Sequence, residues 1–413
     1  MARSCSLRNN HRRQKLPTHP TSLVIARAFT VSLPLVLWFW LLVGPALVLT
    51  AASLLSEPRK AAYVRRRLAE ASEFLPPASV IVPVKGEDQG LRENLAALAS
   101  LDYPDYELLI VARCADDIPG GVLPGRARIV LAHGDDPHTG EKVQNLAAAV
   151  LAARKPSEVF AFADSDGRVT RRWLRSLVAP LADESLGAAT GYRWFTPGAA
   201  NFSSILRAAW DAVSCGMLGP GDTRFVWGGA MAIRRQTFAE AEVLKHWKNT
   251  VSDDYALAAA VRALGLTVAF APGALVPSPE RISMRGLFSW VGRQMTITRV
   301  YAQRLWVLGL VAHVLYCGAM LASIATGYRG IPVGWWALAA QLLPSFWKAA
   351  RRTALARESL PEYSDWFRRY AWTHIACAPL ATWLWLVALA SAAFSSTIEW
   401  RGYRYDLKTP TIR

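Results

Sequence analysis

The apolar run over residues 28–55 contains no charged residue and constrains this chain more than any other feature. As a helix, it is long enough to cross the roughly 30 Å hydrocarbon core of a bilayer. A cleaved signal peptide would have a shorter apolar core, followed by a small-residue cleavage site. Here the run leads into Glu57, Arg59 and an arginine-rich helical segment. We therefore expect a retained membrane anchor, preceded by a basic tail over residues 1–27.

Three more apolar runs lie near the C-terminus, at roughly residues 305–326, 333–346 and 372–394. The middle run is short and is interrupted by Gln341. Tryptophans stand near the ends of these runs, as they do in the aromatic belts of membrane proteins: Trp306, Trp335, Trp336, Trp347, Trp372 and Trp400. Buried helices of a soluble domain would fit these lengths less well. We expect about three C-terminal transmembrane helices in a bundle over residues 305–396.

The formal net charge of +16 suggests a nucleic-acid partner at first sight. The basic residues instead cluster beside the apolar runs, at Arg59, Lys60, Arg65, Arg66, Arg67, Lys348, Arg351, Arg352, Arg357, Arg368 and Arg369. This placement fits the positive-inside rule and attraction to anionic lipid, so we expect a bilayer partner and no nucleic acid. The rule predicts a multi-pass protein with residues 57–304 in the cytoplasm and the tail over residues 397–413 outside. The basic N-terminal tail conflicts with an outside N-terminus.

Between the membrane runs, residues 76–280 alternate strand and helix patterns. Strands are expected at residues 78–84, 106–112, 127–131 and 159–163, and helices at residues 91–100, 143–153 and 173–181. This alternation predicts an α/β domain with a mostly parallel sheet covered on both faces.

Two later stretches, residues 201–218 and 282–304, mix apolar residues with arginines at helical spacing. Such a segment can lie in the membrane interface, with its arginines reaching lipid phosphates. An amphipathic helix packed on the sheet is an equal alternative for each. We assign residues 281–304 as an interfacial amphipathic segment.

Asp164 and Asp166 follow the predicted strand over residues 159–163. Side chains at i and i+2 of an extended segment point the same way, so the two carboxylates can converge on one hard cation. Strand ends in open α/β sheets are also where ligands bind. A cation held there suits chemistry that expels a nucleotide diphosphate. An acidic turn after a buried strand is the alternative, because such short motifs recur by chance.

At this point the chain resembles membrane-bound inverting glycosyltransferases of the ceramide glucosyltransferase type, which have a Rossmann-like GT-A catalytic domain. The landmarks are Ser79-Val-Ile-Val-Pro-Val-Lys-Gly, Leu101-Asp-Tyr-Pro, Lys142-Val-Gln-Asn, Asp164-Ser-Asp-Gly, Gly228-Gly-Ala-Met-Ala-Ile-Arg-Arg, Ser252-Asp-Asp-Tyr and Thr397-Ile-Glu-Trp-Arg-Gly-Tyr-Arg-Tyr. Each is weak alone, but their shared order and spacing are specific for the superfamily.

The resemblance implies a set of contacts to the nucleotide-sugar. The loop that begins at Lys85 would lie against the nucleotide, and Lys142 and Asn145 would flank the diphosphate. Asp164 would contact the nucleotide-sugar, and it would bind Mg²⁺ or Mn²⁺ together with Asp166. Lys142 as a solvated charge at a helix start is the alternative.

Two further donor contacts follow from the resemblance. Cys114 occupies the position where the family has an aspartate, so contact with the base and ribose passes to Asp116. Gly229 and its neighbour Gly228 would let the backbone approach the sugar or acceptor closely. A simple tight turn is the alternative for the two glycines.

Asp254 matches the family's catalytic base, which takes the proton of the acceptor hydroxyl. Asp253 is the rival, and an N-cap role before a helix over residues 255–264 is the structural alternative. Arg293 matches the arginine of the family's Gln/Arg-x-x-Arg-Trp motif and would stabilise the departing diphosphate. Gln294 replaces the tryptophan of that motif, which puts the acceptor pocket in doubt.

The resemblance implies transfer of a hexose, glucose from UDP-glucose, with inversion onto the hydroxyl of a membrane lipid such as ceramide or diacylglycerol. A processive polysaccharide synthase is the nearest alternative, but it should carry an intact Gln-x-x-Arg-Trp element. A non-catalytic membrane lipid-binding protein with a degenerate nucleotide-sugar domain is the alternative from another class.

Overall fold

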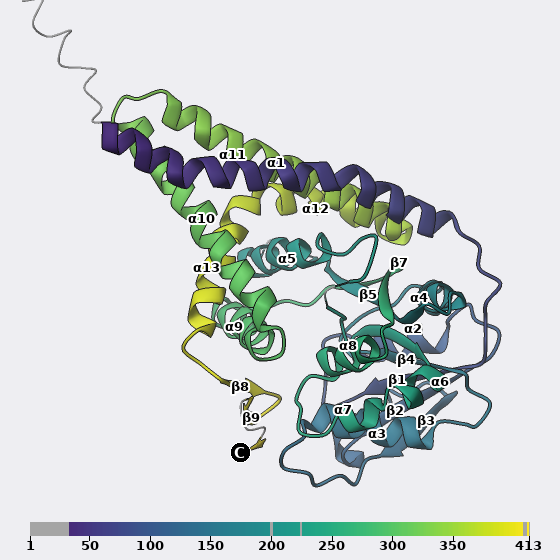
Figure 1. Cartoon of the computed structure of the whole chain (residues 1–413). Coiled ribbons are helices and arrows are strands. Elements are labelled where there is room, and N and C mark those ends of the chain that lie inside the picture. Colours follow the sequence, from purple (N-terminus) through teal and green to yellow (C-terminus); the bar gives the residue numbers. More distant parts are fainter. Residues whose placement is uncertain (1–32, 199–200, 224, 408–410, 413) are drawn as a thin grey trace, which may run out of the picture.

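The computed structural model describes residues 33–198, 201–223, 225–407 and 411–412, so the predicted tail over residues 1–27 lies outside the described part (Figure 1). At the centre of the α/β part is a seven-stranded sheet with the strand order β3-β2-β1-β4-β6-β5-β7. Within this order only β6 runs antiparallel to its neighbours, and the other pairings are parallel. The predicted α/β class with a mostly parallel sheet is confirmed.

Four strands follow the sequence prediction closely. They are β1 (Ala78–Pro83), β2 (Tyr106–Ala112), β3 (Ala127–Leu131) and β4 (Val159–Ala163). The edge strand β3 is largely exposed. In β1, β2 and β4 the side chains alternate between two buried cores: Val80 and Val82 face one side of the sheet, and Ile81 faces the other. Because both faces are covered, these strands appear in the sequence as short apolar runs rather than as alternating patterns.

Three further strands complete the sheet and were not predicted individually: β5 (Leu186–Phe195), β6 (Ala230–Arg234) and β7 (Thr267–Ser278). β5 and β7 contain glycine, and β7 also contains prolines, all of which weaken a strand pattern. The parallel pair β5–β7 has irregular register between Leu186 and Ala188 and between Thr190 and Tyr192.

Helices cover both faces of the sheet. Leucines and a tryptophan of α2 (Leu91–Ala99) and α4 (Trp173–Val178) pack in the core on one face. On the other face lie α3 (Glu141–Ala152), α8 (Asp253–Ala263) and the short helices α6 (Arg235–Glu240) and α7 (Val243–His246). The helices predicted near residues 91–100, 143–153 and 173–181 therefore exist, with small differences at their ends.

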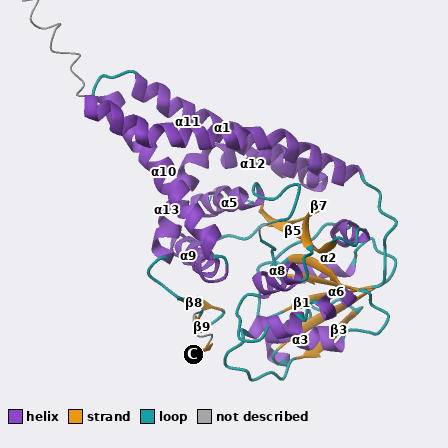
Figure 2. Ribbon diagram, in the orientation of Figure 1, coloured by secondary structure: helices purple, strands orange, loops and turns teal. Residues whose placement is uncertain are grey.

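Long helices form a second layer beside the α/β part (Figure 2). They are α1 (Leu33–Ala69), α10 (Gln303–Tyr328), α11 (Val333–Ser359), α12 (Ser364–Ala376) and α13 (Ala378–Ala392). Their apolar side chains are widely exposed, including Trp38 at 69% and Trp336 at 75%. Large exposed apolar surfaces of this kind mark contact with a membrane or a partner.

Fewer helices qualify as candidate membrane spans in the described part of the chain than the four apolar runs predict. Among the described residues, two helices are long and apolar enough to cross a membrane, at Leu37–Ala69 and Gln303–Tyr328. A third span exists only if α12 and α13, bent by 60°, count as one. The predicted run over residues 372–394 is broken because Pro379 begins a new helix, α13. α11 does not qualify, since its apolar part is short and Gln341 interrupts it.

The two amphipathic stretches form α5 (Phe202–Cys215) and α9 (Met284–Tyr301). α5 is buried almost throughout and packs against β5 and α13, so the alternative of a helix packed on the protein holds for it. α9 packs on α10 and α13 but leaves Met284 and Phe288 exposed.

The C-terminal segment is not a free tail. β8 (Thr397–Trp400) and β9 (Tyr403–Asp406) form a hairpin, to which β10 (Thr411–Ile412) adds a third strand. Arg401 in the hairpin turn bonds to Asp88 of the α/β domain. The expectation that this tail lies across the membrane from the catalytic domain is therefore wrong, because the two parts are in contact.

Candidate active site

A cavity of about 500 Å³ opens at the carboxyl ends of β1 and β4, where ligands bind in open α/β sheets. Its charged end includes Lys142, Asp164, Asp166, Arg193, Asp254 and Arg293. Its apolar end includes Trp210, Met217, Trp306, Leu308, Trp385 and Leu389, which come from α5, α10 and α13 and the segment after α5. One continuous cavity therefore extends from this cluster of charged side chains to the apolar helices α5, α10 and α13.

Asp164 and Asp166 do converge, but on a cation of the chain itself. Arg193, a buried residue of β5, donates from Nη1 to Oδ2 of Asp166 at 3.0 Å and from Nη2 to Oδ2 of Asp164 at 3.3 Å. Nη2 also bonds to the second oxygen of Asp166. Although burial opposes charge on Asp166, attraction to Arg193 lowers the pKa of this carboxyl below its usual value.

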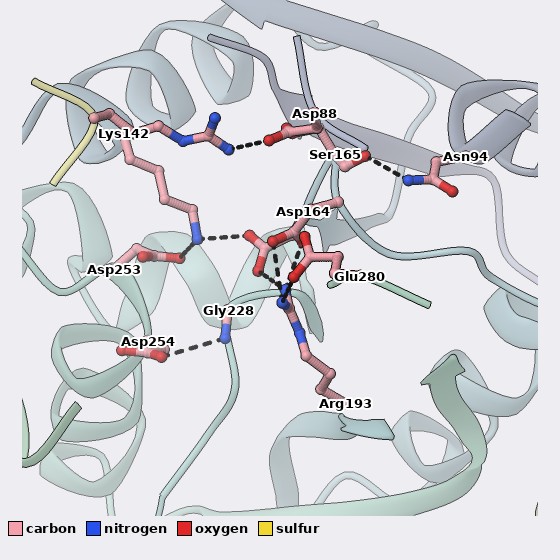
Figure 3. Close-up of polar contacts among 12 residues, drawn as sticks. Asp88, Asn94, Lys142, Asp164, Ser165, Arg193, Gly228, Asp253, Asp254 and Glu280 are labelled. Carbon is pink, nitrogen blue, oxygen red and sulfur yellow. Dashed lines mark hydrogen bonds and ion pairs between the residues drawn. The ribbon is translucent and has the colours of Figure 1, made fainter. Parts of the chain in front are cut away.

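A second cation, with a largely covered side chain, lies on the other side of Asp164 (Figure 3). Lys142, in the first turn of α3, donates to Oδ1 of Asp164 at 2.9 Å and lies 3.2 Å from Oδ2 of Asp253. Burial alone would favour the neutral amine, but attraction to Asp164 and Asp253 raises the pKa of Lys142. Its charge is therefore fixed at neutral pH. The predicted alternative of a solvated surface lysine does not hold.

The carboxylate of Asp254 is held by three neighbours in the first turn of α8 and in the loop before β6. Oδ1 accepts from the Ser252 hydroxyl at 2.5 Å and from the Tyr255 backbone at 2.7 Å. Oδ2 accepts from the Gly228 backbone at 3.3 Å (Figure 3). The N-cap of α8 is Ser252, so neither Asp253 nor Asp254 is the N-cap. Asp254 lines the same cavity as Asp164 and Asp166.

Asp253 differs from Asp254 in its surroundings. It is 4% exposed and its carboxylate faces Lys142. Burial raises the pKa of Asp253 to about 6, helped by repulsion from Asp254 and Asp164 and opposed by Lys142. Of the two neighbours, Asp254 is the carboxylate that is not committed to an ion pair.

Gly228 and Gly229 are required by close packing of this cluster. A Cβ on Gly229 would lie 2.6 Å from Oδ2 of Asp164 and closer still to the ring of Trp227. A Cβ on Gly228 would lie against the carboxylate of Asp253, with Lys142 Nζ at 3.1 Å. The predicted close approach is therefore to protein side chains of the site.

Arg293, on α9, lines the cavity and makes no ion pair within the described part of the chain. Its guanidinium lies 5.6 Å from the ring centroid of Trp400. Burial lowers the pKa of Arg293 to about 10, so it remains a cation at neutral pH. Gln294, at the place of the family tryptophan, also lines the cavity, where Trp290 and Trp400 supply aromatic surface.

The C-terminal hairpin lines the charged end of the cavity through Trp400, Arg401 and Tyr405. Arg401 donates to a carboxylate oxygen of Asp88, whose other oxygen accepts from the Ser165 hydroxyl at 2.5 Å. Lys85 donates to Glu141 at 2.6 Å, and its Nζ lies 3.9 Å from the ring centroid of Tyr403. The loop after β1 is thus held between the sheet and the hairpin.

Of the other residues predicted to contact the nucleotide-sugar, Asn145 lies in the cavity and Asp116 does not. Asn145 is buried and lines the cavity, and its Oδ1 has no hydrogen-bond partner in the described residues. Asp116 is exposed on a short 3-10 turn, Ala115–Asp117, and does not line the cavity. The structure therefore does not bring Asp116 to the other predicted residues.

Asp164 and Asp166 are the residues of the cavity that were predicted to hold a metal ion. Within the described part of the chain, no cluster of three or more His, Cys, Asp or Glu side chains is arranged to hold a metal. Asp164 and Asp166 alone fit a hard divalent cation whose other ligands are phosphate oxygens and water. Their point of convergence is held by Nη2 of Arg193, so a metal and this guanidinium compete for the same oxygens.

A family model described as glycosyl transferase family 21 matches residues 38–412, which span the long helices, the sheet and the C-terminal hairpin. The chain belongs to glycosyl transferase family 21. This is the ceramide glucosyltransferase family, so the expected class of enzyme, a glycosyltransferase, is confirmed. A search of curated proteins found no match to this family 21 member.

Solved structures give only weak likenesses. A mannosyltransferase from Pyrobaculum calidifontis in complex with GDP-Man and Mn2+ is 19% identical and covers 83% of this chain and 99% of its own, with a TM-score of 0.37. Glucosyl-3-phosphoglycerate synthase from Mycobacterium tuberculosis, in complex with Mn2+, UDP and glucosyl-3-phosphoglycerate, is 16% identical. It covers 59% of this chain and 84% of its own, with a TM-score of 0.38. These scores are too low to support an argument, so the family model alone decides the family.

The sequence analysis did not predict several charged residues in or beside this cavity. Arg193 and Glu280 belong to strands or strand ends that were not predicted, although an arginine inside the apolar stretch Tyr192-Arg-Trp-Phe was a usable signal. Glu280 lies 3.9 Å from Arg193 and 3.3 Å from Arg207, and burial and Asp166 raise its pKa to about 6. Arg401 stood within a recognised landmark, but nothing in the pattern indicated its contact with Asp88.

Proposed function

We propose that this protein transfers a hexose, glucose carried by UDP-glucose, with inversion onto the hydroxyl of a membrane lipid such as ceramide or diacylglycerol. The observation that carries the proposal is the continuous cavity between the ionised cluster and the apolar helices. A donor needs cations for its diphosphate, and a lipid acceptor needs an apolar space for its chains. The cavity offers both, and its volume is within the roughly 300–1,000 Å³ usual for ligand sites.

In the proposed reaction, the GT-A domain holds the donor at the charged end. Lys142 and Arg293 would be the cations that face the diphosphate, and the side chain of Asn145 lines the same cavity. Mg²⁺ or Mn²⁺ held by Asp164 and Asp166 would neutralise part of the diphosphate charge.

Asp254 is the proposed general base. It would take the proton of the lipid hydroxyl as that oxygen attacks the anomeric carbon, and the bond to the diphosphate would break on the opposite side of the sugar. Its three hydrogen-bond donors fix the direction of the carboxylate, which favours a defined proton acceptor. A single displacement of this kind inverts the anomeric centre.

The acceptor would enter from the membrane side, between α9, α10 and α13. Positively charged residues beside the apolar runs favour a cytoplasmic catalytic domain, where nucleotide-sugars are made available. This orientation is part of the proposal.

The test is to incubate membranes that contain the protein with a panel of radiolabelled nucleotide-sugars and to identify the labelled lipid. The proposal expects label from UDP-glucose in a lipid of one added sugar, with the anomeric configuration opposite to that of the donor. A ladder of long water-soluble products would support a processive synthase instead. Absence of both labelled product and UDP release would support a non-catalytic protein.

A further inference from the structure

A second cavity, of about 210 Å³, lies between α1, α11, β7 and the segment after α5. Charged side chains line it: Glu57 and Lys60 from α1, and Lys348 and Arg352 from α11. Three cations thus face one carboxylate. The proposed transferase reaction uses none of these residues.

Arg352 carries the strongest indication of a missing partner. Within the described residues it makes no hydrogen bond and no ion pair, and its Nε is buried without a partner. The side chain lies against Gly216, where a Cβ would be 3.2 Å from Nη1. Burying an unpaired charge is costly, so an anion is the expected neighbour of this guanidinium.

Lys348 and Lys60 also place positive charge in this cavity. Lys348 donates to the hydroxyl of Ser53 at 2.9 Å, a neutral acceptor. Lys60 donates to Glu57 at 3.1 Å and to the Gly216 carbonyl at 2.7 Å. The single carboxylate of the cavity is therefore already paired with Lys60.

The position of the cavity along the helices points to the kind of anion. Glu57 is the first charged residue of α1 after its apolar part, and Lys348 is the first charged residue of α11. Just before them, Leu55 is 78% exposed and Leu343 is 66% exposed. The cavity thus lies at the level where apolar helix surface gives way to charge, which is where lipid headgroups lie.

We propose that this cavity binds the phosphate group of an acidic phospholipid, with Arg352 and Lys348 as its ligands. Phosphate accepts hydrogen bonds from guanidinium and ammonium groups, and basic pockets between membrane helices are known to suit lipid headgroups. Val213 and Met217 line this cavity and the first one, so the bound headgroup adjoins the acceptor space.

The experiment measures thermal unfolding of the full-length protein in mild detergent with added phosphatidylglycerol, phosphatidylcholine or inorganic phosphate. Phosphatidylglycerol should raise the Tm of the wild type, and phosphatidylcholine should not. Arg352→Gln and Lys348→Gln should each weaken the apparent affinity for phosphatidylglycerol at least about tenfold. Arg351→Gln is the matched control, because Arg351 is the neighbour of Arg352 on α11 and faces Trp347 instead of the cavity.

The outcomes distinguish a lipid headgroup from free phosphate as the bound anion, and both of these from a purely structural role of Arg352. Stabilisation by inorganic phosphate that depends on Arg352, with no effect of phosphatidylglycerol, would overturn the lipid assignment. An equal response to the two lipids, or an equal loss in Arg351→Gln, would overturn the site. Without added anion, Arg352→Gln should be at least as stable as the wild type, because it removes a guanidinium group that has no ion-pair partner in the described residues and whose Nε is buried. If that variant fails to fold, Lys348→Gln still decides the question through its lipid affinity.

Discussion

Arg193 and Asp166 form a two-point ion pair inside the larger cavity, with Nη1 of the arginine 3.0 Å from Oδ2 of the aspartate and Nη2 bonded to Oδ1. The same guanidinium also reaches Asp164. The two carboxylates predicted to bind a metal are therefore paired with a cation of the chain itself. Arg193 would have to give up these contacts, or share them, when a divalent ion and a diphosphate enter.

Replacing Arg193 should leave the carboxylates around it without their shared cation, so that they repel one another. In Arg193→Met, Asp166 and Glu280 lose their shared cation, and breaking a buried ion pair commonly costs about 3–5 kcal/mol. We expect a lower Tm than that of the wild type. Added Mn²⁺ should restore more stability to the variant than to the wild type, because the freed oxygens then bind the metal. Thermal unfolding with Mn²⁺ and with chelator measures this, and an equal metal response in both proteins would contradict the competition.

The C-terminal hairpin should affect donor binding. Arg401→Gln removes the contact with Asp88, so the loop after β1 is less firmly held beside the donor. We expect about a tenfold fall in kcat/KM for the nucleotide-sugar, mainly through KM, with little change in Tm. Arg404→Gln is the control, since Arg404 is an exposed arginine on the same hairpin. A fall of similar size in both variants would show that the effect is one of charge alone.

Narrowing the apolar end should separate lipid transfer from donor chemistry. Gly309 lines the cavity on α10, and a Cβ there would lie 3.5 Å from Leu389. Gly309→Leu should reduce sugar transfer to a long-chain lipid by about tenfold or more. Hydrolysis of UDP-glucose, in which water replaces the lipid acceptor, should persist. Gly292→Leu, on a helix glycine with open space around it, should leave both activities unchanged. Equal loss of transfer and UDP release in Gly309→Leu would argue against an acceptor role for this end.

One buried carboxyl predicts a pH dependence of stability. Burial raises the pKa of Asp211 from its ordinary 3.8 to about 7, against the opposing effects of Arg193 and the hydrogen bond from Tyr192. Between these two values the folded state binds the proton and the unfolded state does not. Stability should therefore be highest at low pH for this group and fall as pH rises toward 7, by at most about 1.4 kcal/mol per pH unit.

Asp211→Asn removes that titration while keeping a polar side chain of similar size. Its Tm should depend less on pH than the wild-type Tm between pH values of about 5 and 7, and it should exceed the wild-type Tm near pH 8. Unfolding scans at matched ionic strength measure the difference. Parallel pH profiles for the two proteins would show that Asp211 is not the group responsible.

The sequence predicted those strands and helices whose own residues form a clear local pattern. β1 to β4 were predicted because each is a short apolar run bounded by turn residues. β5 and β7 escaped because glycines and prolines interrupt them, and their register is set by pairing across the sheet. The bent pair α12 and α13 looked like one span in sequence, since hydropathy does not register the break at Pro379.

The candidate site shows the same division. Spacing alone placed Asp164 and Asp166 on one side of a strand, and the structure has them converge. The resemblance to the family predicted that Lys142, Asn145, Arg293 and Asp116 share one site. The first three line the same cavity, and Asp116 does not. The contacts of Arg193 and Arg401 could not be found this way, because their partners are distant in sequence and are brought near only by the sheet order and by the hairpin docking onto the domain.

The most direct test of the proposed reaction is the rate of sugar transfer by Asp254→Asn, measured together with the Kd for UDP-glucose. Asn keeps the size of the side chain but cannot accept the proton, so transfer should fall about a hundredfold or more while the Kd stays close to that of the wild type. Asp253→Asn, next to it, should weaken donor binding through Lys142 rather than abolish turnover. Near-normal transfer by Asp254→Asn, with a large loss in Asp253→Asn, would contradict the assignment of Asp254 as the base.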